Sequence, residues 1–283
     1  KNIKKIKKLK LPGVLVKKLQ EGVSQSELII FCTPMSEYKD IILKINNFIS
    51  SKTLITDIGS SKIESSKIIK KFLKKGIHWT RSHPITGSEV SGPEHGKDNL
   101  FKDKWCVLIK DKKTNLKHLK FLNSFWKKMG SKTITMNSEK HDKIFSITSH
   151  LPHLIAYNLV KSAQDFEKIL KFNLIKYSAG GLRDFTRIAA SNPIMWRDIF
   201  IDNSELIIQA IDKFSKNLDE FKATSWGKKI DWLNLSKEDM MNPLVNATIA
   251  RLYISTMDSK AIPDNKKGRA ELWARIYNTP DDP

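Results

Sequence analysis

Short continuous apolar runs alternate with amphipathic stretches in the first half of the chain. Runs of this kind predict buried strands, because a strand covered on both faces is apolar throughout. Between these runs, apolar residues recur three and four positions apart, as they do on one face of a helix. The predicted strands are residues 27–32, 53–58, 77–79, 105–109 and 132–136.

The alternation continues to about residue 137 and predicts an α/β domain with a Rossmann-like parallel sheet over residues 1–137. From residue 138 the period is helical throughout, which predicts an all-α second domain over residues 138–283. Doubly wound sheets bind ligands beyond the carboxyl ends of their strands. Three segments at these ends carry candidate chemistry: Thr33-Pro34, Asp57-Ile58-Gly59-Ser60 and Ser82-His83-Pro84.

Capping residues predict two helix starts. Ser61 and Glu64 have the spacing of a capping box, which predicts that a helix begins at Ser61. Asn192 before Pro193 predicts an N-cap with proline at the first helical position and one long helix beyond it. Apolar residues alternate four and three apart along this helix and predict a packing seam of Ile207, Ile211, Phe214, Leu218 and Phe221.

The formal net charge is +20 at pH 7, a value found in nucleic-acid-binding proteins. Only 7 of the 50 basic residues are arginine, and the lysines are spread along every segment, which favours a solvated surface. We therefore expect no nucleic-acid partner, and we expect the charge to steer anionic substrates. No apolar run approaches the roughly 18–20 residues of a membrane span, and no apolar core follows the N-terminal lysines. Neither a membrane segment nor a secretory signal is expected.

The two cysteines, Cys32 and Cys106, both lie in apolar runs. We interpret them as buried, reduced thiols, which is the common state of cysteine in a reducing compartment. This interpretation predicts a cytoplasmic location.

A cationic corner is predicted after residue 178. The adjacent glycines Gly180 and Gly181 allow a positive φ or a close approach to a ligand. Arg183 and Arg187 follow one helical turn apart, so both guanidinium groups can face one side and bind a carboxylate. The alternative is a surface ion pair, for example between Arg187 and Asp184.

Histidines are the other candidates for chemistry. His83 is predicted to lie beyond a strand end, in a loop rich in glycine and serine, where it can take a proton near neutral pH. The alternative is a structural histidine. His150 and His153 share a helix face, and Pro152 between them should kink the helix and free a carbonyl group. A metal site with His141 as third ligand is the rival interpretation, but no carboxylate or cysteine spacing supports it, so no metal is predicted.

Several segments resemble one family. Residues 178–198, which include Gly-Gly-Leu-Arg-Asp-Phe-Thr-Arg, closely resemble the signature of the prephenate and arogenate dehydrogenase family. Residues 82–92 resemble the family's His-Pro-Ile/Met-Ala-Gly-Ser/Thr-Glu-x-Ser-Gly, with Thr86 in place of the usual alanine. The resemblance covers roughly residues 28–222. Shorter matches are Thr33-Pro34, Asp57-x-Gly59-Ser60-x-Lys62 and Ser149-His150-Leu151-Pro152-His153.

This resemblance implies an NAD- or NADP-dependent oxidoreductase of tyrosine biosynthesis. The implied reaction is oxidative decarboxylation of prephenate to 4-hydroxyphenylpyruvate, or of arogenate to tyrosine, with hydride transfer to NAD(P)⁺. Both substrates and both cofactors stay open at this point. The resemblance also implies a homodimer formed through the helical domain, in which Trp196 would reach the partner's active site.

The resemblance assigns roles to single residues. His83 would accept the proton of the substrate hydroxyl group, and Ser60 would hold that group by a hydrogen bond. Arg187 would bind a substrate carboxylate, with Asp184 as its orienting partner. His150 is interpreted as a structural residue or as a support for the residues that line the pocket. The other implied assignments are Gly181, Trp196 and His153, the last as a donor, in the substrate pocket, and Thr33, Pro34, Asp57, Gly59 and Ser60 at the cofactor.

One family feature is not found in the sequence, the Gly-x-Gly-x-x-Gly fingerprint of dinucleotide binding. The glycines before residue 60 are Gly13, Gly22 and Gly59, which do not form this pattern. We therefore expect the chain to begin after the fingerprint. The alternative functions are a catalytically inactive fragment of such an enzyme, another dehydrogenase with a Rossmann and a helical domain, or a basic nucleic-acid-binding module. A helix is expected at residues 244–257, in a tail of residues 223–283 that we do not align with the family.

Overall fold

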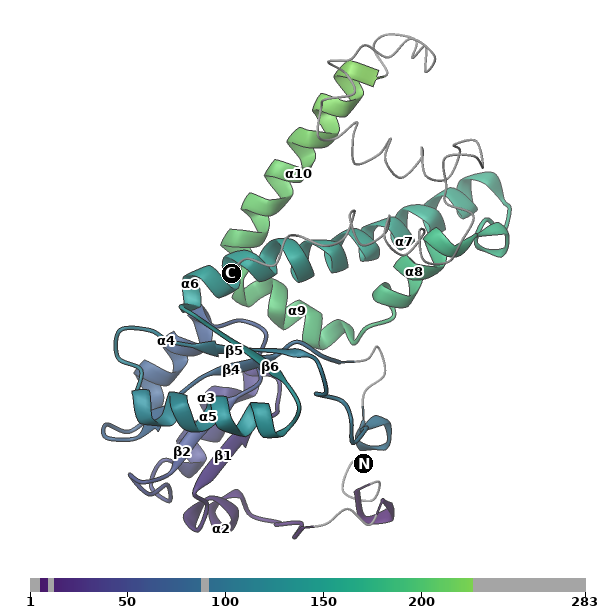
Figure 1. Cartoon of the computed structure of the whole chain (residues 1–283). Helices are drawn as coiled ribbons and strands as arrows, with labels where there is room; N and C mark the ends of the chain where they lie inside the picture. Colours follow the sequence, from purple (N-terminus) through teal and green to yellow (C-terminus); the bar gives the residue numbers. More distant parts are fainter. Residues whose placement is uncertain (1–5, 10–12, 88–91, 226–283) are drawn as a thin grey trace, which may run out of the picture. The chain divides into compact units, whose positions relative to one another are not determined.

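The computed structural model describes residues 6–9, 13–87 and 92–225, apart from the side chains of residues 221–225. Contacts divide the chain into two compact units, residues 1–211 and 212–283. All elements described below belong to the first unit, except for the C-terminal part of the last helix (Figure 1). The helix expected at residues 244–257 lies outside the described residues.

In the part of the chain that the structure describes, six strands form two three-stranded sheets. In the first, the strands are parallel in the order β1 (Leu28–Phe31), β2 (Leu54–Asp57), β3 (His78–Trp79). In the second, the order is β4 (Ser82–Pro84), β5 (Trp105–Ile109), β6 (Lys132–Met136), with β5 and β6 parallel and β4 antiparallel to β5. All five predicted strands are therefore confirmed. The strand β4 was not predicted, and its antiparallel pairing departs from a purely parallel sheet.

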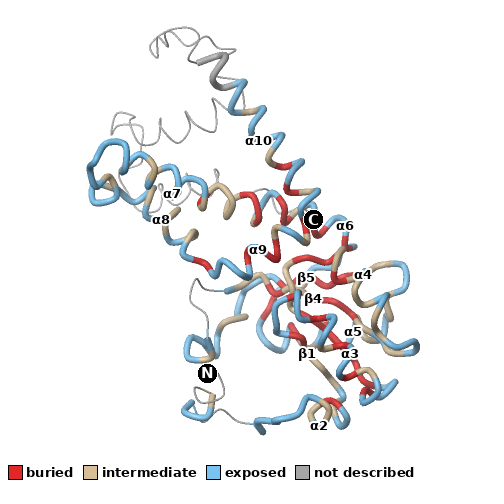
Figure 2. The backbone as a smooth tube through the Cα atoms, turned by 180° about the vertical axis from the view of Figure 1, so that it is seen from behind, coloured by how far each residue is buried: buried red, intermediate tan, exposed pale blue. Residues whose placement is uncertain are grey.

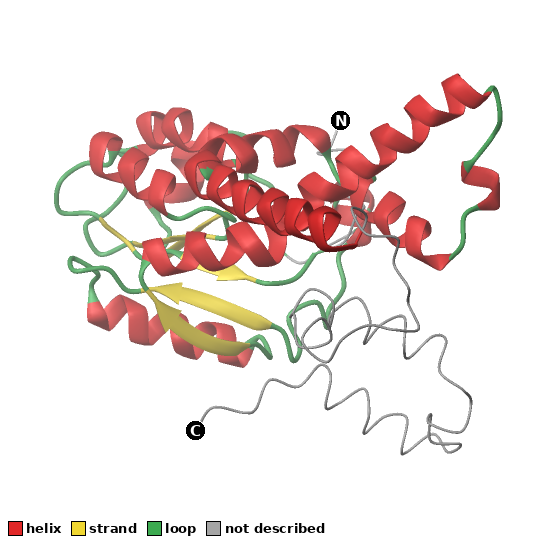
Figure 3. Ribbon diagram, turned by 90° about the horizontal axis from the view of Figure 1, so that it is seen from above, coloured by secondary structure: helices red, strands yellow, loops and turns green. Residues whose placement is uncertain are grey.

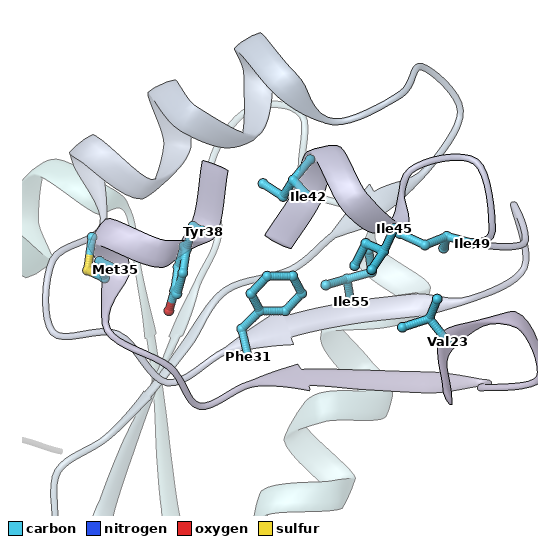
Figure 4. Packing of buried hydrophobic residues seen from close by; sticks show 8 residues of the cluster. All are labelled: Val23, Phe31, Met35, Tyr38, Ile42, Ile45, Ile49 and Ile55. Carbon is cyan, nitrogen blue, oxygen red and sulfur yellow. The ribbon is translucent and has the colours of Figure 1, made fainter. Parts of the chain in front are cut away.

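Helices lie on both faces of the strands (Figure 3). On one face, Ile55 of β2 packs with residues of β1 and α3 in a cluster of Val23, Phe31, Met35, Tyr38, Ile42, Ile45 and Ile49 (Figure 4). On the other face, Leu54 packs with Leu122 and Trp126 of α5. The neighbouring residues Leu54 and Ile55 of β2 thus pack against different layers, and all four residues of the strand are buried. The helices of this region are α2 (Leu19–Ser24), η1 (Met35–Glu37), α3 (Tyr38–Ile45), α4 (Ile63–Phe72), η2 (Pro93–His95) and α5 (Leu116–Lys128).

The chain is helical from residue 138 onward, as far as the structure describes it. A π-turn (Ser146–His150) connects α6 (Ser138–Phe145) directly to α7 (Leu151–Leu170). After a short η4 (Ile175–Tyr177), α8 (Gly180–Ala189) packs along α7. Among the described residues, no helix has the length and apolar character to cross a bilayer.

The long helix predicted from Pro193 is two helices. Asn192 caps α9 (Pro193–Asp202) by accepting hydrogen bonds from Ile194 N–H and Met195 N–H, which confirms the predicted start. The helix then ends at Asn203, and α10 (Ser204–Ser225) begins. The side chain of Asn203 is buried and donates to the carbonyl oxygen of Asp142 at 3.0 Å. This contact with α6 fixes the break between the two helices.

Two sequence interpretations are corrected by burial and backbone geometry. Cys32 is exposed, because it follows the last residue of β1, whereas Cys106 in the middle of the second sheet is buried as predicted. Gly180 and Gly181 form the first turn of α8 and do not adopt a positive φ. Their Cα atoms face open space. Buried residues gather in the strands and in the helices next to them, while the distal part of α7 is largely exposed (Figure 2).

Candidate active site

The carboxyl ends of β1 and β2 form one edge of the sheet. The two strands are parallel and paired over four residues each. The chain leaves β1 through Thr33 and Pro34, both exposed, and it leaves β2 through Gly59 and Ser60, both half-buried. These four residues, predicted to contact the cofactor, therefore share an accessible edge. An edge of this kind fits a dinucleotide, which doubly wound sheets bind beyond their strand ends.

Packing favours a glycine at position 59. A Cβ atom there would lie 2.9 Å from Met35 Sδ and 3.0 Å from Tyr38 Oη, closer than van der Waals contact allows. The N–H of Gly59 also donates to Asp57 Oδ2 at 3.1 Å. The backbone before Ser60 is thus held flat against η1 and α3.

Asp57 and Lys62 form a buried ion pair beneath this edge. Both side chains are fully buried, and Lys62 Nζ donates to Asp57 Oδ2 at 2.6 Å and to the carbonyl oxygen of Ser82 at 2.7 Å. Asp57 Oδ1 accepts from Trp79 Nε1 at 3.0 Å. The carboxylate of Asp57 is therefore enclosed by donors from its own chain, and its role at the cofactor stays a prediction.

The start of α4 is capped from a distant part of the chain. The capping box predicted at Ser61 is wrong: the N-cap is Lys62, and the Ser61 hydroxyl group is buried without a hydrogen-bond partner. The carboxylate of Asp142, on α6, takes this role. It accepts from Ile63 N–H at 2.8 Å and from Lys62 N–H at 2.8 Å and 3.1 Å, one distance to each oxygen.

His83 lies in the middle of β4, paired with Val107 of β5, and not in a loop beyond a strand end as predicted. Its side chain is half-buried. His83 Nδ1 is 2.8 Å from His141 Nε2, and His141 Nδ1 is 2.6 Å from Asp142 Oδ1. His83, His141 and Asp142 therefore form a continuous hydrogen-bonded chain, which we call the His–His–Asp chain.

Burial keeps the two histidines of this chain neutral. Burial lowers the pKa of His83 well below 6.5, and the nearby His141 and Lys62 lower it further. Burial, with smaller effects from Lys62 and His150, lowers the pKa of His141 to about 2. Near neutral pH, each imidazole therefore has one protonated nitrogen and one lone pair. Because both ring nitrogens of His141 are hydrogen-bonded, this residue is not placed to be the third metal ligand considered above.

His153 lies on α7 and stacks on Trp196 of α9, with ring centroids 3.6 Å apart. Trp196 is 6% exposed within its own chain, and its implied reach into a partner's active site stays a prediction. His153 Nδ1 donates to the Ser149 carbonyl oxygen at 2.8 Å, next to the π-turn. Burial lowers the pKa of His153, so Nε2 has a lone pair in the neutral ring. The predicted role of His153 as a donor in the substrate pocket stays a prediction.

Three residues predicted at the substrate lie on α8 and are exposed: Arg187 at a carboxylate, Asp184 as its orienting partner, and Gly181 in the pocket lining. Arg187 Nε is 3.7 Å from Asp184 Oδ1, one turn earlier on the helix. Asp184 can therefore orient Arg187, as implied by the resemblance, and the surface ion pair considered as the alternative is also present. The structure places this group along α7, the helix that also bears His153.

The residues that sequence reasoning missed are the two that support His83. His141 was considered only as a metal ligand, and Asp142 was not considered. The available signal was the His-Asp pair in the first turns of the helix that opens the predicted second domain. His150 is structural, as predicted: it is 1% exposed, and its Nδ1 accepts from Asn203 Nδ2 at 3.0 Å.

Asp202, at the end of α9, is predicted to destabilise the fold at neutral pH. Burial, followed by the charges of Glu64, Asp198 and Asp142, raises its pKa to about 6. Between pH 4 and 6 the folded chain binds a proton that the unfolded chain has released, so stability falls as the pH rises through 6. Asp202→Asn should therefore raise the free energy of unfolding at pH 8 by about 1–2 kcal/mol, allowing for solvent screening. Urea unfolding at pH 8 and pH 4 measures this difference.

The gain from Asp202→Asn should vanish at pH 4, where both forms of the folded chain are neutral at this position. Asp40→Asn, at an exposed position of α3, is the matched control and should change stability little at either pH. An equal gain at pH 8 and pH 4 would show that the effect does not come from the ionised carboxylate.

Two family models match the chain one after the other. Residues 2–135 match the nucleotide-binding domain of prephenate dehydrogenase, and residues 137–236 match its dimerization domain. The chain is 31% identical over 215 residues to a cyclohexadienyl dehydrogenase of Zymomonas mobilis, covering 76% of this chain and 73% of that protein. It is 28% identical over 266 residues to the prephenate dehydrogenase of Bacillus subtilis, covering 93% of this chain and 67% of that protein.

Solved structures give a similar result. A prephenate dehydrogenase from Aquifex aeolicus, in complex with hydroxyphenyl propionate and NAD⁺, superposes with a TM-score of 0.72 at 33% identity. The match covers 84% of this chain and 80% of that one. The arogenate dehydrogenase of Synechocystis superposes with a TM-score of 0.62 at 19% identity, which supports the fold alone.

Proposed function

The chain belongs to the prephenate dehydrogenase family, and from this premise we propose the residues that carry out its reaction. The enzyme catalyses oxidative decarboxylation of prephenate or arogenate, with hydride transfer to NAD(P)⁺, in tyrosine biosynthesis. We place His83 as the general base. The observation that supports this most is that His83 is a neutral, half-buried histidine hydrogen-bonded through Nδ1, so its Nε2 atom is available to a substrate.

The cofactor, when bound at the edge formed by Thr33, Pro34, Gly59 and Ser60, supplies the hydride acceptor. His83 accepts the proton of the ring hydroxyl group as the ring carbon loses its hydride. Ser60 donates or accepts a hydrogen bond at the same oxygen and orients it. The bond to the ring carboxylate then breaks, CO₂ leaves, and the electron pair completes the aromatic ring. The phenolate oxygen takes back the proton that His83 holds.

The direct test is to measure NAD⁺ and NADP⁺ reduction with prephenate and with arogenate in parallel. The faster pair identifies the substrate and the cofactor. Release of CO₂ in a one-to-one ratio with reduced cofactor is expected, because the ring can become aromatic only by losing its carboxylate. Reduction without CO₂ release would contradict the proposed reaction.

We place Arg187 at a substrate carboxylate, with Asp184 holding its guanidinium group. Arg187→Ala should raise KM about 10–150-fold with little change in kcat, because a charged hydrogen bond contributes about 1.5–3 kcal/mol. Steady-state kinetics measures both constants. Arg197→Ala is the matched control, since Arg197 also pairs with a neighbouring aspartate, Asp198, on an adjacent helix. An unchanged KM for Arg187→Ala would make Arg187 a structural residue.

We also propose a homodimer formed through the helical domain, residues 138–283, with the domain boundary after residue 137. The match to a dimerization domain over residues 137–236 supports it. So do the large apolar side chains exposed on and after α7, which a second chain would cover. These are Phe166, Ile169, Leu170, Phe172 and Tyr177. The cytoplasmic location stays a prediction from composition.

A further inference from the structure

We propose that Asp142, acting through His141, fixes which nitrogen of His83 is protonated. Asp142 does not contact the substrate in this scheme. It is a positioning residue that keeps the lone pair of His83 on Nε2, the nitrogen that His141 leaves unoccupied. The inference rests on the proposed role of His83 as the general base, and it concerns how the Nε2 lone pair of that base is maintained.

The argument starts at the carboxylate of Asp142. Ile63 N–H and Lys62 N–H point at this carboxylate from 2.8 Å each, and a backbone N–H can only donate. Asp142 is therefore held as an acceptor at both oxygens by groups whose protons cannot move. Its Oδ1 atom lies 2.6 Å from His141 Nδ1, so His141 Nδ1 must carry a proton and donate it.

The protonation of His83 follows from that of His141. His141 is neutral, so with a proton on Nδ1 it has a lone pair on Nε2. His83 Nδ1 lies 2.8 Å from this lone pair and must donate to it. His83 then carries its proton on Nδ1 and its lone pair on Nε2. At each step only one position of the proton satisfies the hydrogen bonds, so the fixed backbone N–H groups of α4 determine the tautomer of His83.

Replacing the carboxylate of Asp142 by an amide shows how the tautomer of His83 depends on it. In Asp142→Asn, an amide oxygen in the place of Oδ2 can accept from both Ile63 N–H and Lys62 N–H, which lie 2.8 Å and 3.1 Å from that atom, and this places the NH₂ group toward His141 Nδ1. That NH₂ group donates, so His141 takes its proton on Nε2 and donates to His83 Nδ1. His83 then carries its proton on Nε2 and has no lone pair for the substrate. The substitution keeps the shape of the side chain and reverses the direction of both hydrogen bonds in the His–His–Asp chain.

The same carboxylate also determines the position of the other candidate catalytic residue. Ser60 lies two residues before Lys62, whose N–H is bound by Asp142. One side chain of α6 therefore holds both the loop that bears Ser60 and the tautomer of His83, which β4 bears.

The first test measures the tautomer in the unmodified enzyme. Two-bond ¹⁵N–¹H correlation spectra of the histidine-labelled protein, assigned with His83→Gln, should show His83 protonated on Nδ1 and not on Nε2. This is unlike free histidine near neutral pH, which favours the other tautomer. A proton on Nε2 of His83 would overturn the inference without any substitution at Asp142.

The second test is the kinetics of Asp142→Asn. We expect kcat to fall about 10²–10⁴-fold, with KM and cofactor Kd changed less than about threefold, as for other carboxylates that orient a catalytic histidine. The spectrum of the variant should show the proton of His83 moved to Nε2. Asp111→Asn is the matched control: Asp111 accepts from the Ser138 N–H at the start of α6 but does not contact a histidine. It should keep kcat and the His83 tautomer.

The outcomes separate this inference from the proposed function. If His83→Ala loses activity and Asp142→Asn keeps kcat, the inference is wrong and the general base stands. If both variants keep kcat, the role of His83 itself is wrong. If Asp142→Asn does not fold, the tautomer of the unmodified enzyme and of His141→Phe, which removes the acceptor for His83 Nδ1, decide the matter.

Discussion

The His83→Ala enzyme is expected to lose about 10²–10⁴-fold in kcat while its cofactor Kd stays unchanged. The hydroxyl group of the substrate must lose its proton as hydride leaves, and without His83 this proton passes to water. His83 is proposed to contact the hydroxyl group of the substrate and not the cofactor, so cofactor binding should not depend on it. Stopped-flow reduction of the cofactor, together with fluorescence titration of cofactor binding, measures both quantities.

His78→Ala is the matched control for this experiment, because His78 is an exposed histidine on the neighbouring strand β3. It should keep kcat. Added imidazole should restore part of the activity of His83→Ala, since it can occupy the space left and accept the proton. Full activity of His83→Ala would remove the general base from the proposed mechanism.

Lys62→Met is expected to lower the free energy of unfolding by about 3–5 kcal/mol, the cost of breaking a buried ion pair. Lys62 is fully buried, and burial lowers its pKa while the charge of Asp57 opposes that shift. Removing the ammonium group leaves the Asp57 carboxylate buried without its counter-charge and also frees the carbonyl oxygen of Ser82. Urea unfolding followed by circular dichroism measures the loss.

Two further variants sharpen this result. Lys67→Met, on the same helix α4, removes an exposed lysine that pairs with Glu64 and should leave stability unchanged within error. Asp57→Asn added to Lys62→Met should recover part of the loss, because the remaining amide is neutral and still accepts from Trp79 Nε1. Additive losses in the double variant would contradict the explanation by an uncompensated charge.

A strand or helix could be predicted where the residues of that segment themselves determine whether it is buried. The strands β1, β2 and β5 contain mostly apolar residues that lie buried or half-buried, so their own sequence predicts them. The strand β4 could not be predicted, since Ser82, His83 and Pro84 have no strand pattern of their own. They form a strand because β5 offers an unpaired edge beside them. The break at Asn203 was missed for a related reason: it depends on a hydrogen bond to α6, 61 residues away in the chain.

The candidate site divides in the same way. The motif residues His83, Ser60 and Arg187 could be named from the sequence by family resemblance, and their roles stay predictions. Asp142 could not, because its importance arises only when α6 and α4 come together in space. The capping box at Ser61 failed for the same reason, since a distant carboxylate satisfies the helix start better than the local hydroxyl group does. Local patterns predict local hydrogen bonds, and this site is built from long-range ones.

The π-turn between α6 and α7 changes the direction in which two histidines point around the helix axis. In a regular α-helix each residue turns the chain by about 100°, so twelve residues would set His141 and His153 about 120° apart around the axis. A π-turn accommodates one additional residue, so this stretch turns roughly as far as eleven residues would. The two side chains then come within about 20° of the same direction. Deleting one residue from Ser146–His150 would remove the additional residue and leave a regular helix in which the two histidines keep their common face. Deleting one residue from the regular part of α6 after His141 would instead rotate His153 by about 100°, so the helix content would survive while the common face would be lost.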